Sequence, residues 1–588
     1  MNQGGLTQSI KKLPWPGSLI LAGSLLSPAP LAAQGAAVEA RNGMVTSSQA
    51  IASQVGVDIL KKGGNAVDAG IATGLALAVV YPEAGNIGGG GFMMIHTAAG
   101  KDTVIDYRER APKAATRDMY VGPDGKLIGG EGSSTQGWKA GGVPGTVAGF
   151  FLAYQKYGSG KVSWSDLVAP AVRLATQGFP MSAQVRAHLE GSKDGLGKYA
   201  DSKRIFLNGG KGYEVGQLFR QTELGATLKR IQHDPMDFYT GRTAQLTAAA
   251  MSNHGGSISL EDLAGYQATE REPLRTRYRG YDIATMPPPS SGGIVIAQVL
   301  KMVEPFDVAA MGPGSAAKVH LFAEAQKRAF RDRAEYMGDA DFVQVQVDKL
   351  LDPEYIKGRM ADFDPAKATP ASEIKPGLGP FEFVPVKESH ETTQFSVVDK
   401  TGNAVSNTYT LNDWFGSQVT IPGAGFLLND EMDDFTAKVG APNMFGLLQS
   451  EANAIVPGKR PLSSMSPTVV SKDGKIVLVT GSPGGPTIIN TVLEIITNVI
   501  DHGMPVMKAV EYPRFHNQWM PDNLFYEHYG LSPDTLEKLS GMGYAIKVGV
   551  PWGDELQGDG ETIGVDTEKG LLLGAADPRG GDSRAVGY

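Results

Sequence analysis

The sequence predicts a mixed α and β protein. Apolar residues recur at helical spacing through much of the first 370 positions. Runs of β-branched residues, such as 476–480, are typical of strands. Residues 392–411 also read as a hairpin, because a strand pattern, a group of turn residues and a returning strand follow one another. Periodicity alone predicts no more than this mixed class.

Helices are expected wherever the apolar spacing persists for several turns. Residues 51–62 form the first such segment and stop at a Gly-Gly pair, a common helix end. Residues 65–80 are almost wholly apolar, so that helix must be buried. The other expected helices are 165–177, 218–231, 244–253, 294–303, 316–336 and 487–500.

A glycine-rich loop at 85–91 precedes two expected strands, 92–96 and 103–107. A phosphate-binding loop would carry Lys and Ser or Thr at the entrance to a helix. Here a strand follows the glycines. The sequence therefore argues against a nucleotide site at this loop.

The composition of the chain excludes several classes of function and site. The 588 residues suggest about four domains as a weak prior, although large mixed folds often exceed it. A net charge of -8 with interspersed signs argues against a nucleic-acid partner. Cysteine is absent, which excludes disulfides, a cysteine nucleophile and thiolate metal sites, and the nine histidines show no metal-ligand spacing. We expect neither a metal nor a cofactor.

The first 33 residues have the pattern of a secretory signal. Lys11 and Lys12 precede a short apolar run at 19–26, and small residues surround Ala33. An uncleaved membrane anchor is the alternative, but the run is too short to span a bilayer. We expect an exported protein, periplasmic or secreted, with no membrane span after signal cleavage.

A threonine at the start of the hairpin carries the chemical prediction. Thr392 opens a strand far from either end of the chain, where it is poorly placed for Ser/His/Asp catalysis. Cleavage of the Glu391–Thr392 bond would give Thr392 a free α-amine, which can act as the base for its own hydroxyl. The alternative is an ordinary threonine in a strand.

Four motifs follow Thr392 in a fixed order. They are Asn-Thr-Tyr-Thr-Leu-Asn at 407–412, Leu-Leu-Asn-Asp-Glu-Met-Asp-Asp-Phe at 427–435, Arg-Pro-Leu-Ser-Ser-Met-Ser-Pro-Thr at 460–468 and Thr-Gly-Ser-Pro-Gly-Gly at 480–485. From about residue 42 to 588 the chain resembles the γ-glutamyltransferase family of N-terminal-nucleophile hydrolases. The resemblance implies an α+β fold, a four-layer αββα sandwich. After self-cleavage, a large subunit (34–391) and a small catalytic subunit (392–588) would share it as a heterodimer.

The resemblance also assigns roles to individual residues. Thr392 would be the nucleophile and Thr410 its hydrogen-bond partner. The substrate-binding residues would be Arg108, Ser463 and Ser464 for an α-carboxylate, Glu431 and Asp434 for an α-amine, and Asn412 as a further polar contact. Taken without the resemblance, Arg108 reads as a surface ion pair, and the acidic segment 430–434 reads as a solvated turn or a calcium loop.

Gly484 and Gly485 lie between an expected strand and an expected helix, where backbone N–H groups can stabilise an oxyanion. A plain strand-to-helix turn is the alternative. Phe445 falls in a segment that corresponds to an active-site lid, at a position where many relatives carry tyrosine. The missing hydroxyl puts in doubt any hydrogen bond that latches the lid.

The implied activity is hydrolysis and transfer of the γ-glutamyl group of glutathione and similar amides through a γ-glutamyl-threonine ester. Water would give hydrolysis, and an amino acid or peptide amine would give transpeptidation. One alternative is a glutaryl or cephalosporin acylase of the same superfamily, which needs no α-amine on its substrate. Another is an uncleaved homologue that binds peptides.

Overall fold

The computed structural model describes residues 1, 35–379 and 392–588. Residues 35–588 form one compact unit. Glu391 and the leader predicted at 1–33, apart from its first residue, lie outside the described residues. No helix in the described ranges is long and apolar enough to cross a membrane.

Two seven-stranded antiparallel sheets form the centre of this unit. The first sheet has the order β19-β2-β10-β11-β3-β4-β7 and the second has the order β1-β18-β17-β13-β12-β9-β8. The first comprises β2 (Gly43–Ser47), β3 (Gly90–His96), β4 (Asp102–Asp106), β7 (Thr269–Arg271), β10 (Thr393–Asp399), β11 (Ala404–Thr410) and β19 (Arg584–Gly587). The second comprises β1 (Val38–Ala40), β8 (Leu274–Tyr278), β9 (Tyr281–Thr285), β12 (Thr468–Lys472), β13 (Lys475–Thr480), β17 (Thr562–Asp566) and β18 (Leu571–Ala575).

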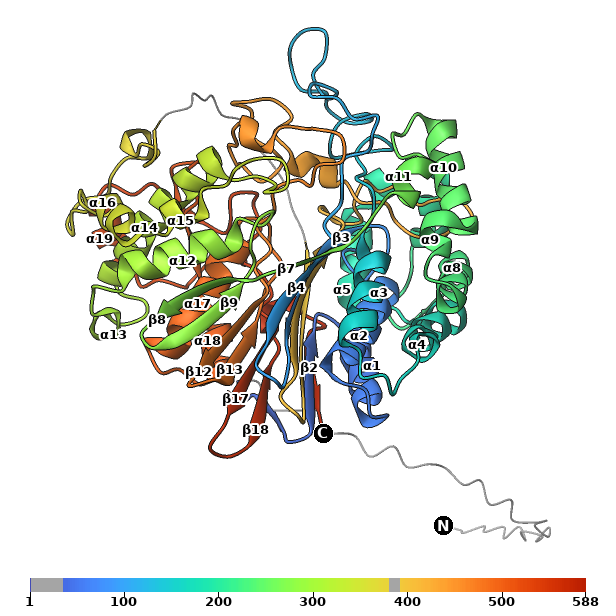
Figure 1. Cartoon of the computed structure of the whole chain (residues 1–588), viewed down its shortest axis with the longest axis horizontal. Helices are drawn as coiled ribbons and strands as arrows, with labels where there is room; N and C mark the ends of the chain where they lie inside the picture. Colours follow the sequence, from blue (N-terminus) through green and yellow to red (C-terminus); the bar gives the residue numbers. More distant parts are fainter. Residues whose placement is uncertain (2–34, 380–391) are drawn as a thin grey trace. The chain divides into compact units, whose positions relative to one another are not determined.

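Helices cover the outer face of each sheet (Figure 1). On the first sheet these include α1 (Ala50–Lys61), α2 (Ala66–Val80), α3 (Thr146–Tyr157), α4 (Trp164–Gln177), α8 (Thr222–His233) and α10 (Arg242–His254). On the second they include α12 (Gly292–Val303), α14 (Ala316–Tyr336), α17 (Thr487–Ile500), α18 (Val506–Glu511) and α19 (Pro533–Gly541). The wholly apolar segment predicted to be a buried helix is α2, and all its residues are buried.

Shorter elements complete the chain. The helices among them are α5 (Ala183–Gly191), α6 (Lys193–Leu196), α7 (Ala200–Phe206), α9 (Asp237–Thr240), α11 (Leu260–Ala264), α13 (Val308–Met311), α15 (Val347–Leu350) and α16 (Pro353–Arg359). The strands are β5 (Phe179–Pro180), β6 (Leu218–Phe219), β14 (Phe515–His516), β15 (Leu524–Tyr526) and β16 (Ile546–Val548). Single 3₁₀ turns are Asn208–Gly210, Ala371–Glu373, Glu431–Asp434, Glu451–Asn453 and Pro578–Gly580.

Apolar cores fill the spaces between the four layers. Phe395 of β10 packs with helical residues on one face of the first sheet. On the other face, Phe92 of β3 shares a core with Val479 and Ile563 of the second sheet. Leu478 then packs against the second helical layer. The order helix, sheet, sheet, helix confirms the αββα sandwich.

Two sequence expectations need correction. The helix expected at 218–231 begins only at Thr222, because Leu218–Phe219 pairs with Phe179–Pro180 as a short strand. The helical spacing through much of the first 370 positions also gave no sign of β7, β8 and β9, which lie within that range. Burial alternates along Leu274–Tyr278, since its two arginines point to solvent.

Candidate functional site

The hairpin of β10 and β11 brings two threonines together. Thr393 lies opposite Tyr409 in the antiparallel register, so Thr392 adjoins Thr410 at the end of the hairpin. The Thr392 side chain is buried, and both threonines line the same pocket. Thr410 Oγ1 also accepts a hydrogen bond of 2.8 Å from the backbone N–H of Asn412.

Polar contacts tie this hairpin to the second sheet. Gln394 Nε2 donates to Ser406 Oγ at 3.0 Å, and Ser406 Oγ donates to the carbonyl of Thr480 at 2.8 Å. A Cβ at Gly481 would approach Gln394 Oε1 to 2.4 Å, so glycine allows the loop after β13 to lie against β10. The position of that loop is thereby fixed relative to Thr392.

One small pocket collects nearly all the predicted site residues. Its lining is Arg108, Thr392, Thr410, Asn412, Glu431, Asp434, Phe445, Leu447, Ser463, Ser464, Met465, Gly485 and Ile488. Gly484 instead lines a neighbouring cavity. Glu391 lies outside the described residues. The sequence did not single out Leu447, Met465 and Ile488, which carry no polar group.

Arg108 is the electrostatic centre of the pocket. Its guanidinium is fully buried and contacts Glu431 through Nη1 and Asp434 through Nη2. Burial by itself lowers the pKa of Arg108, but the carboxylates, Glu431 foremost, raise it overall. The arrangement confirms that Arg108 is no surface arginine, and it rules out a solvated acidic turn for Glu431 and Asp434.

Buried carboxyl groups outnumber the arginine in this region. Burial raises the pKa of Glu431 well above its usual value, and Arg108 opposes that rise. Burial also raises the pKa of Glu109 to about 7, and its Oε2 lies 3.6 Å from Arg108 Nη1. Sequence reasoning missed Glu109, although its place beside Arg108 in the Asp-Tyr-Arg-Glu segment was a usable signal.

Gly484 and Gly485 form the turn between β13 and α17. Both have positive φ, 117° and 49°, which favours glycine. Their carbonyls accept the first hydrogen bonds of α17, from Thr487 N at 3.0 Å and Ile488 N at 3.2 Å. A Cβ at Gly485 would meet the Phe445 ring at 2.6 Å, so this turn and the segment around Phe445 are packed together.

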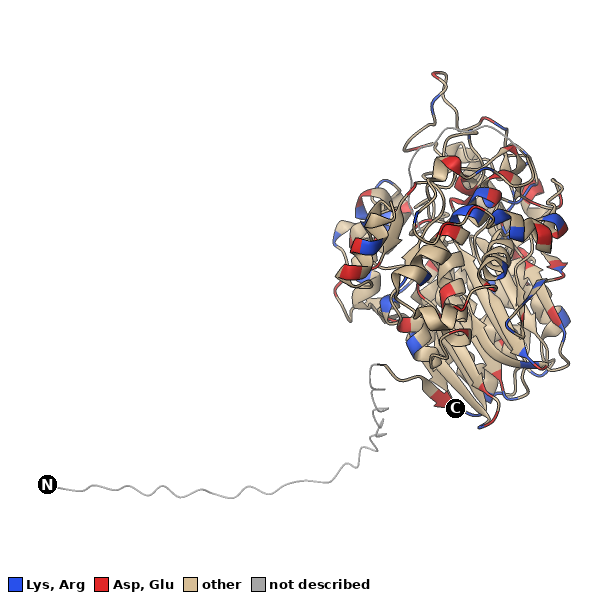
Figure 2. Cartoon of the chain, turned by 90° about the vertical axis from the view of Figure 1, so that its left-hand side faces the viewer, with Lys and Arg blue, Asp and Glu red and all other residues tan. Residues whose placement is uncertain are grey.

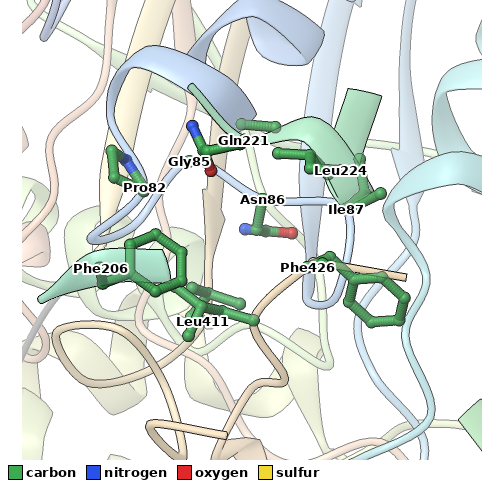
Figure 3. Close-up of a pocket in the computed structure, with 12 residues that line it drawn as sticks. Pro82, Gly85, Asn86, Ile87, Phe206, Gln221, Leu224, Leu411 and Phe426 are labelled. Carbon is green, nitrogen blue, oxygen red and sulfur yellow. The ribbon is translucent and has the colours of Figure 1, made fainter. Parts of the chain in front are cut away.

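The glycine loop at 85–91 supports Thr410 from behind the pocket. Asn86 Nδ2 donates to the Thr410 carbonyl at 2.8 Å, and Asn86 Oδ1 accepts from Gly89 N at 3.0 Å. Asn86 lies among the residues that line a small separate cavity, between Leu411 and Ile87 (Figure 3). The loop leads into β3, and Asn86 connects it to the end of β11.

Phe445 lines the pocket, and the segment 436–446 that carries it is held by three side chains. Asp433 accepts from Met444 N at 2.7 Å, and Asn443 Nδ2 donates to Asp434 Oδ1 at 3.1 Å. Gln518 Nε2 donates to the Phe445 carbonyl at 3.0 Å. The Phe445 ring packs edge-on against Trp552. Hydrogen bonds to the backbone of Met444 and Phe445 therefore hold this segment, although Phe445 has no hydroxyl that could form one.

The two serines lie beside the start of α12. Ser463 N donates to the Pro289 carbonyl at 2.9 Å, and Ser291 Oγ donates to the Ser463 carbonyl at 2.8 Å. A Cβ at Gly292 would lie 1.9 Å from Ser466 Oγ, so the close approach requires glycine. The Pro-Pro-Pro-Ser-Ser-Gly-Gly stretch at 287–293 thus forms the wall that holds the serine pair.

A calcium loop was one alternative that the sequence left open for the acidic segment 430–434. Among the residues that the structure describes, no group of three or more His, Cys, Asp or Glu is arranged to hold a metal ion. Glu431 and Asp434 both point to a guanidinium. The calcium reading of 430–434 finds no support in this arrangement.

Comparisons with known proteins agree with this site. The profile of the gamma-glutamyltranspeptidase family matches residues 52–587. A glutathione hydrolase proenzyme from Pseudomonas sp. (strain A14) is 48% identical, over 95% of this chain and 96% of that protein. Cephalosporin acylase from Bacillus halodurans has a TM-score of 0.81 at 27% identity, covering 97% of this chain and 99% of its own.

A solved chain of Helicobacter pylori gamma-glutamyltranspeptidase is 42% identical, with a TM-score of 0.55. The match covers 99% of that chain but 60% of this one. Both the family profile and the full-length relative extend across the pocket residues. The chain therefore belongs to the gamma-glutamyltranspeptidase family.

Proposed function

We propose that this protein hydrolyses and transfers the γ-glutamyl group of glutathione and related γ-glutamyl amides. One observation carries the proposal: Thr392, which immediately precedes β10, lines the same pocket as a buried arginine flanked by two carboxylates. A γ-glutamyl group carries an α-amine and an α-carboxylate, and this pocket offers opposite charges for both. The glutathione hydrolase name of the 48% identical relative supports the same substrate.

Thr392 would first act on its own backbone. Its Oγ attacks the carbonyl carbon of Glu391, and the Glu391–Thr392 amide becomes an ester with a free Thr392 amine. Water then cleaves that ester, which restores the hydroxyl and leaves a carboxylate on Glu391. The proposed products are the chains 34–391 and 392–588, and the word proenzyme in the relative's name fits them.

Catalysis would repeat the same chemistry on the substrate. The Thr392 amine takes the hydroxyl proton, Oγ attacks the γ-carbonyl, and the departing amine receives a proton. Backbone N–H groups of Gly484 and Gly485 would hold the oxyanion, and losing one such donor typically costs about 3 kcal/mol in the transition state. Water or an amino acid or peptide amine then opens the γ-glutamyl ester.

Substrate binding follows from the charges around Arg108. Glu431 and Asp434 would hold the α-ammonium, while Arg108 and the hydroxyls of Ser463 and Ser464 would hold the α-carboxylate. Asn412 would add a polar contact, and Thr410 would hydrogen-bond the nucleophile. The segment around Phe445 would limit the access of water to the ester. We also propose export to the periplasm or the medium, on the sequence of the leader alone.

The acylase alternative has support from the TM-score of 0.81 to a cephalosporin acylase. A glutaryl group lacks the α-amine. Comparing L-γ-glutamyl-p-nitroanilide with glutaryl-p-nitroanilide therefore distinguishes a γ-glutamyltransferase from an acylase. We expect the purified protein to release nitroaniline from the L-γ-glutamyl compound at least about 100-fold faster than from the glutaryl compound. Equal rates, or a preference for the glutaryl compound, would favour the acylase.

A denaturing gel with intact mass measurement tests the remaining alternative, an uncleaved homologue that binds peptides. Two fragments with Thr392 at the N-terminus of the smaller one are expected. A single uncut chain without turnover would favour a peptide-binding homologue.

A further inference from the structure

A second buried arginine lies behind the serine pair. Arg333 is part of α14, and its side chain is buried. Its Nε donates to Ser291 Oγ at 2.9 Å, and its Nη2 donates to Ser464 Oγ at 3.4 Å. Arg333 does not appear in the lining of the pocket, whereas Ser464 does. The guanidinium therefore reaches the pocket through a hydroxyl.

The direction of these hydrogen bonds has a chemical consequence. Guanidinium has donors only, so Ser464 Oγ is the acceptor in its contact with Arg333. A hydroxyl that accepts from a cation keeps its own hydrogen to donate, and polarisation makes it a stronger donor. The acceptor that gains most from such a donor is an anion in the pocket.

The same arginine also organises the neighbouring wall. Ser291 Oγ accepts from Arg333 and donates to the Ser463 carbonyl at 2.8 Å. Arg333 thus fixes the Ser464 side chain directly and the Ser463 backbone through one intermediate. The Arg108 guanidinium is shared with Glu431 and Asp434, and the charge of Arg333 also acts on Asp434. Arg333 is thus a second source of positive charge beside the serine pair.

We propose that Arg333 is a positioning residue for recognition of the substrate's α-carboxylate, acting through the Ser464 hydroxyl. This inference rests on the proposed function. It predicts that loss of Arg333 weakens binding of substrates that carry the carboxylate and spares analogues in which the carboxylate is replaced by a neutral amide. A merely structural arginine would affect both kinds of ligand alike.

The test uses Arg333→Gln, Arg333→Lys and the matched control Arg328→Gln. Arg328 is equally buried on the same helix, but it pairs with Glu324 and Asp362 instead of the serines. The readouts are kcat and KM for L-γ-glutamyl-p-nitroanilide, and the inhibition constant of its α-carboxamide analogue, which can be measured whether or not the analogue is turned over. Self-cleavage and the circular dichroism spectrum report folding.

We expect Arg333→Gln to raise KM about tenfold or more, with kcat nearly unchanged and the analogue's inhibition constant within about twofold. Arg333→Lys keeps the charge and should recover part of the loss, and it carries the test if the Gln variant fails to fold. Arg328→Gln should leave the ratio of KM for the substrate to the inhibition constant of the analogue unchanged. Equal losses for both ligands, or no loss, would overturn the inference. If wild-type protein does not turn over the γ-glutamyl substrate, the proposed function itself fails.

Discussion

At the scale of single residues, the pocket is organised around buried charged groups. Arg108 and its carboxylate partners are buried, so removing one member leaves a charge without compensation. In the proposed binding mode, a zwitterionic head group would take over these pairings, with its amine in place of the guanidinium beside the carboxylates. A ligand with only one of the two charges cannot do so.

The first prediction concerns Asp434. In Asp434→Asn we expect kcat/KM for L-γ-glutamyl-p-nitroanilide to fall about 100-fold, because a hydrogen bond between charged groups is worth about 3 kcal/mol. The glutaryl compound has no amine, so its rate should not fall. Steady-state kinetics on the two substrates measure this, and a parallel loss on both would refute the assignment of Asp434 to the amine.

The second prediction concerns pH and Asp433. Burial raises the pKa of Asp433 from 3.8 to about 6, against hydrogen bonds from Ser134 and Met444. Between these two values the folded protein binds a proton that the unfolded chain releases, so this group's contribution to stability is present at low pH and is lost as pH rises through about 6.

Asp433→Asn lacks this titration. Its thermal midpoint relative to wild type should therefore rise between pH 4 and pH 7, by an amount worth at most about 3 kcal/mol. Scanning calorimetry across that range measures the difference. A constant difference would show that Asp433 does not titrate there.

At the scale of elements, the segment 436–446 beside the pocket is held by contacts that a tyrosine hydroxyl does not supply. Gln518 donates to the Phe445 carbonyl, and its Oε1 lies 2.8 Å from His516 Nε2. Burial lowers the pKa of His516 to about 4, so the imidazole is neutral at pH 7. Gln518 is thus held in place by a group that does not change charge near neutrality.

We predict that Gln518→Ala loosens the segment 436–446. Loss of one hydrogen bond, about 1 kcal/mol, should increase the rate of limited proteolysis within this segment about fivefold. The half-buried Gln232 provides the control, because it also donates a side-chain hydrogen bond to a backbone carbonyl, that of Ser165, but does not line the pocket. Gln232→Ala should leave the rate unchanged. Unaltered proteolysis in Gln518→Ala would mean that packing of Phe445 against Gly485 and Trp552 holds the segment by itself.

Elements with a strong local pattern could be predicted from the sequence, and those that depend on distant partners could not. α2, α14, α17 and the hairpin of β10 and β11 follow directly from apolar spacing and turn residues. The strand β8 carries two arginines in five residues, and β6 forms because it pairs with β5 far along the chain.

The same limit applies to the site. The sequence motifs contain most of the lining residues, and the family resemblance indicated that these separate motifs belong to one site. Arg333 lies 131 positions from Ser464 and belongs to a helix whose sequence gives no sign of that contact. Only the packing of α14 against the wall at 287–293 brings the two together.

At the scale of the whole molecule, the proposed subunits are interleaved in both sheets. In the first sheet, β10 and β11 of the small subunit lie between β2 and β3 of the large one. In the second, β12, β13, β17 and β18 are flanked by β1 on one side and β9 and β8 on the other. Cleavage before Thr392 would leave these ladders intact.

We therefore predict that the cleaved protein stays together. Size-exclusion chromatography at nanomolar concentration should give one species containing both fragments, and dissociation should require unfolding. Positive and negative residues are interspersed over the face seen in Figure 2, so salt should have little effect. Separate elution of the fragments in native buffer would contradict the shared fold.

The most direct measurement is made on Thr392→Ala, with Thr392→Ser as its control. Self-cleavage and turnover both need the Thr392 hydroxyl, so the alanine protein should give one uncut mass and no release of nitroaniline from L-γ-glutamyl-p-nitroanilide. The serine protein should be cleaved before residue 392 and retain activity. An alanine protein that is still cut at this bond and still consumes the substrate would contradict the account.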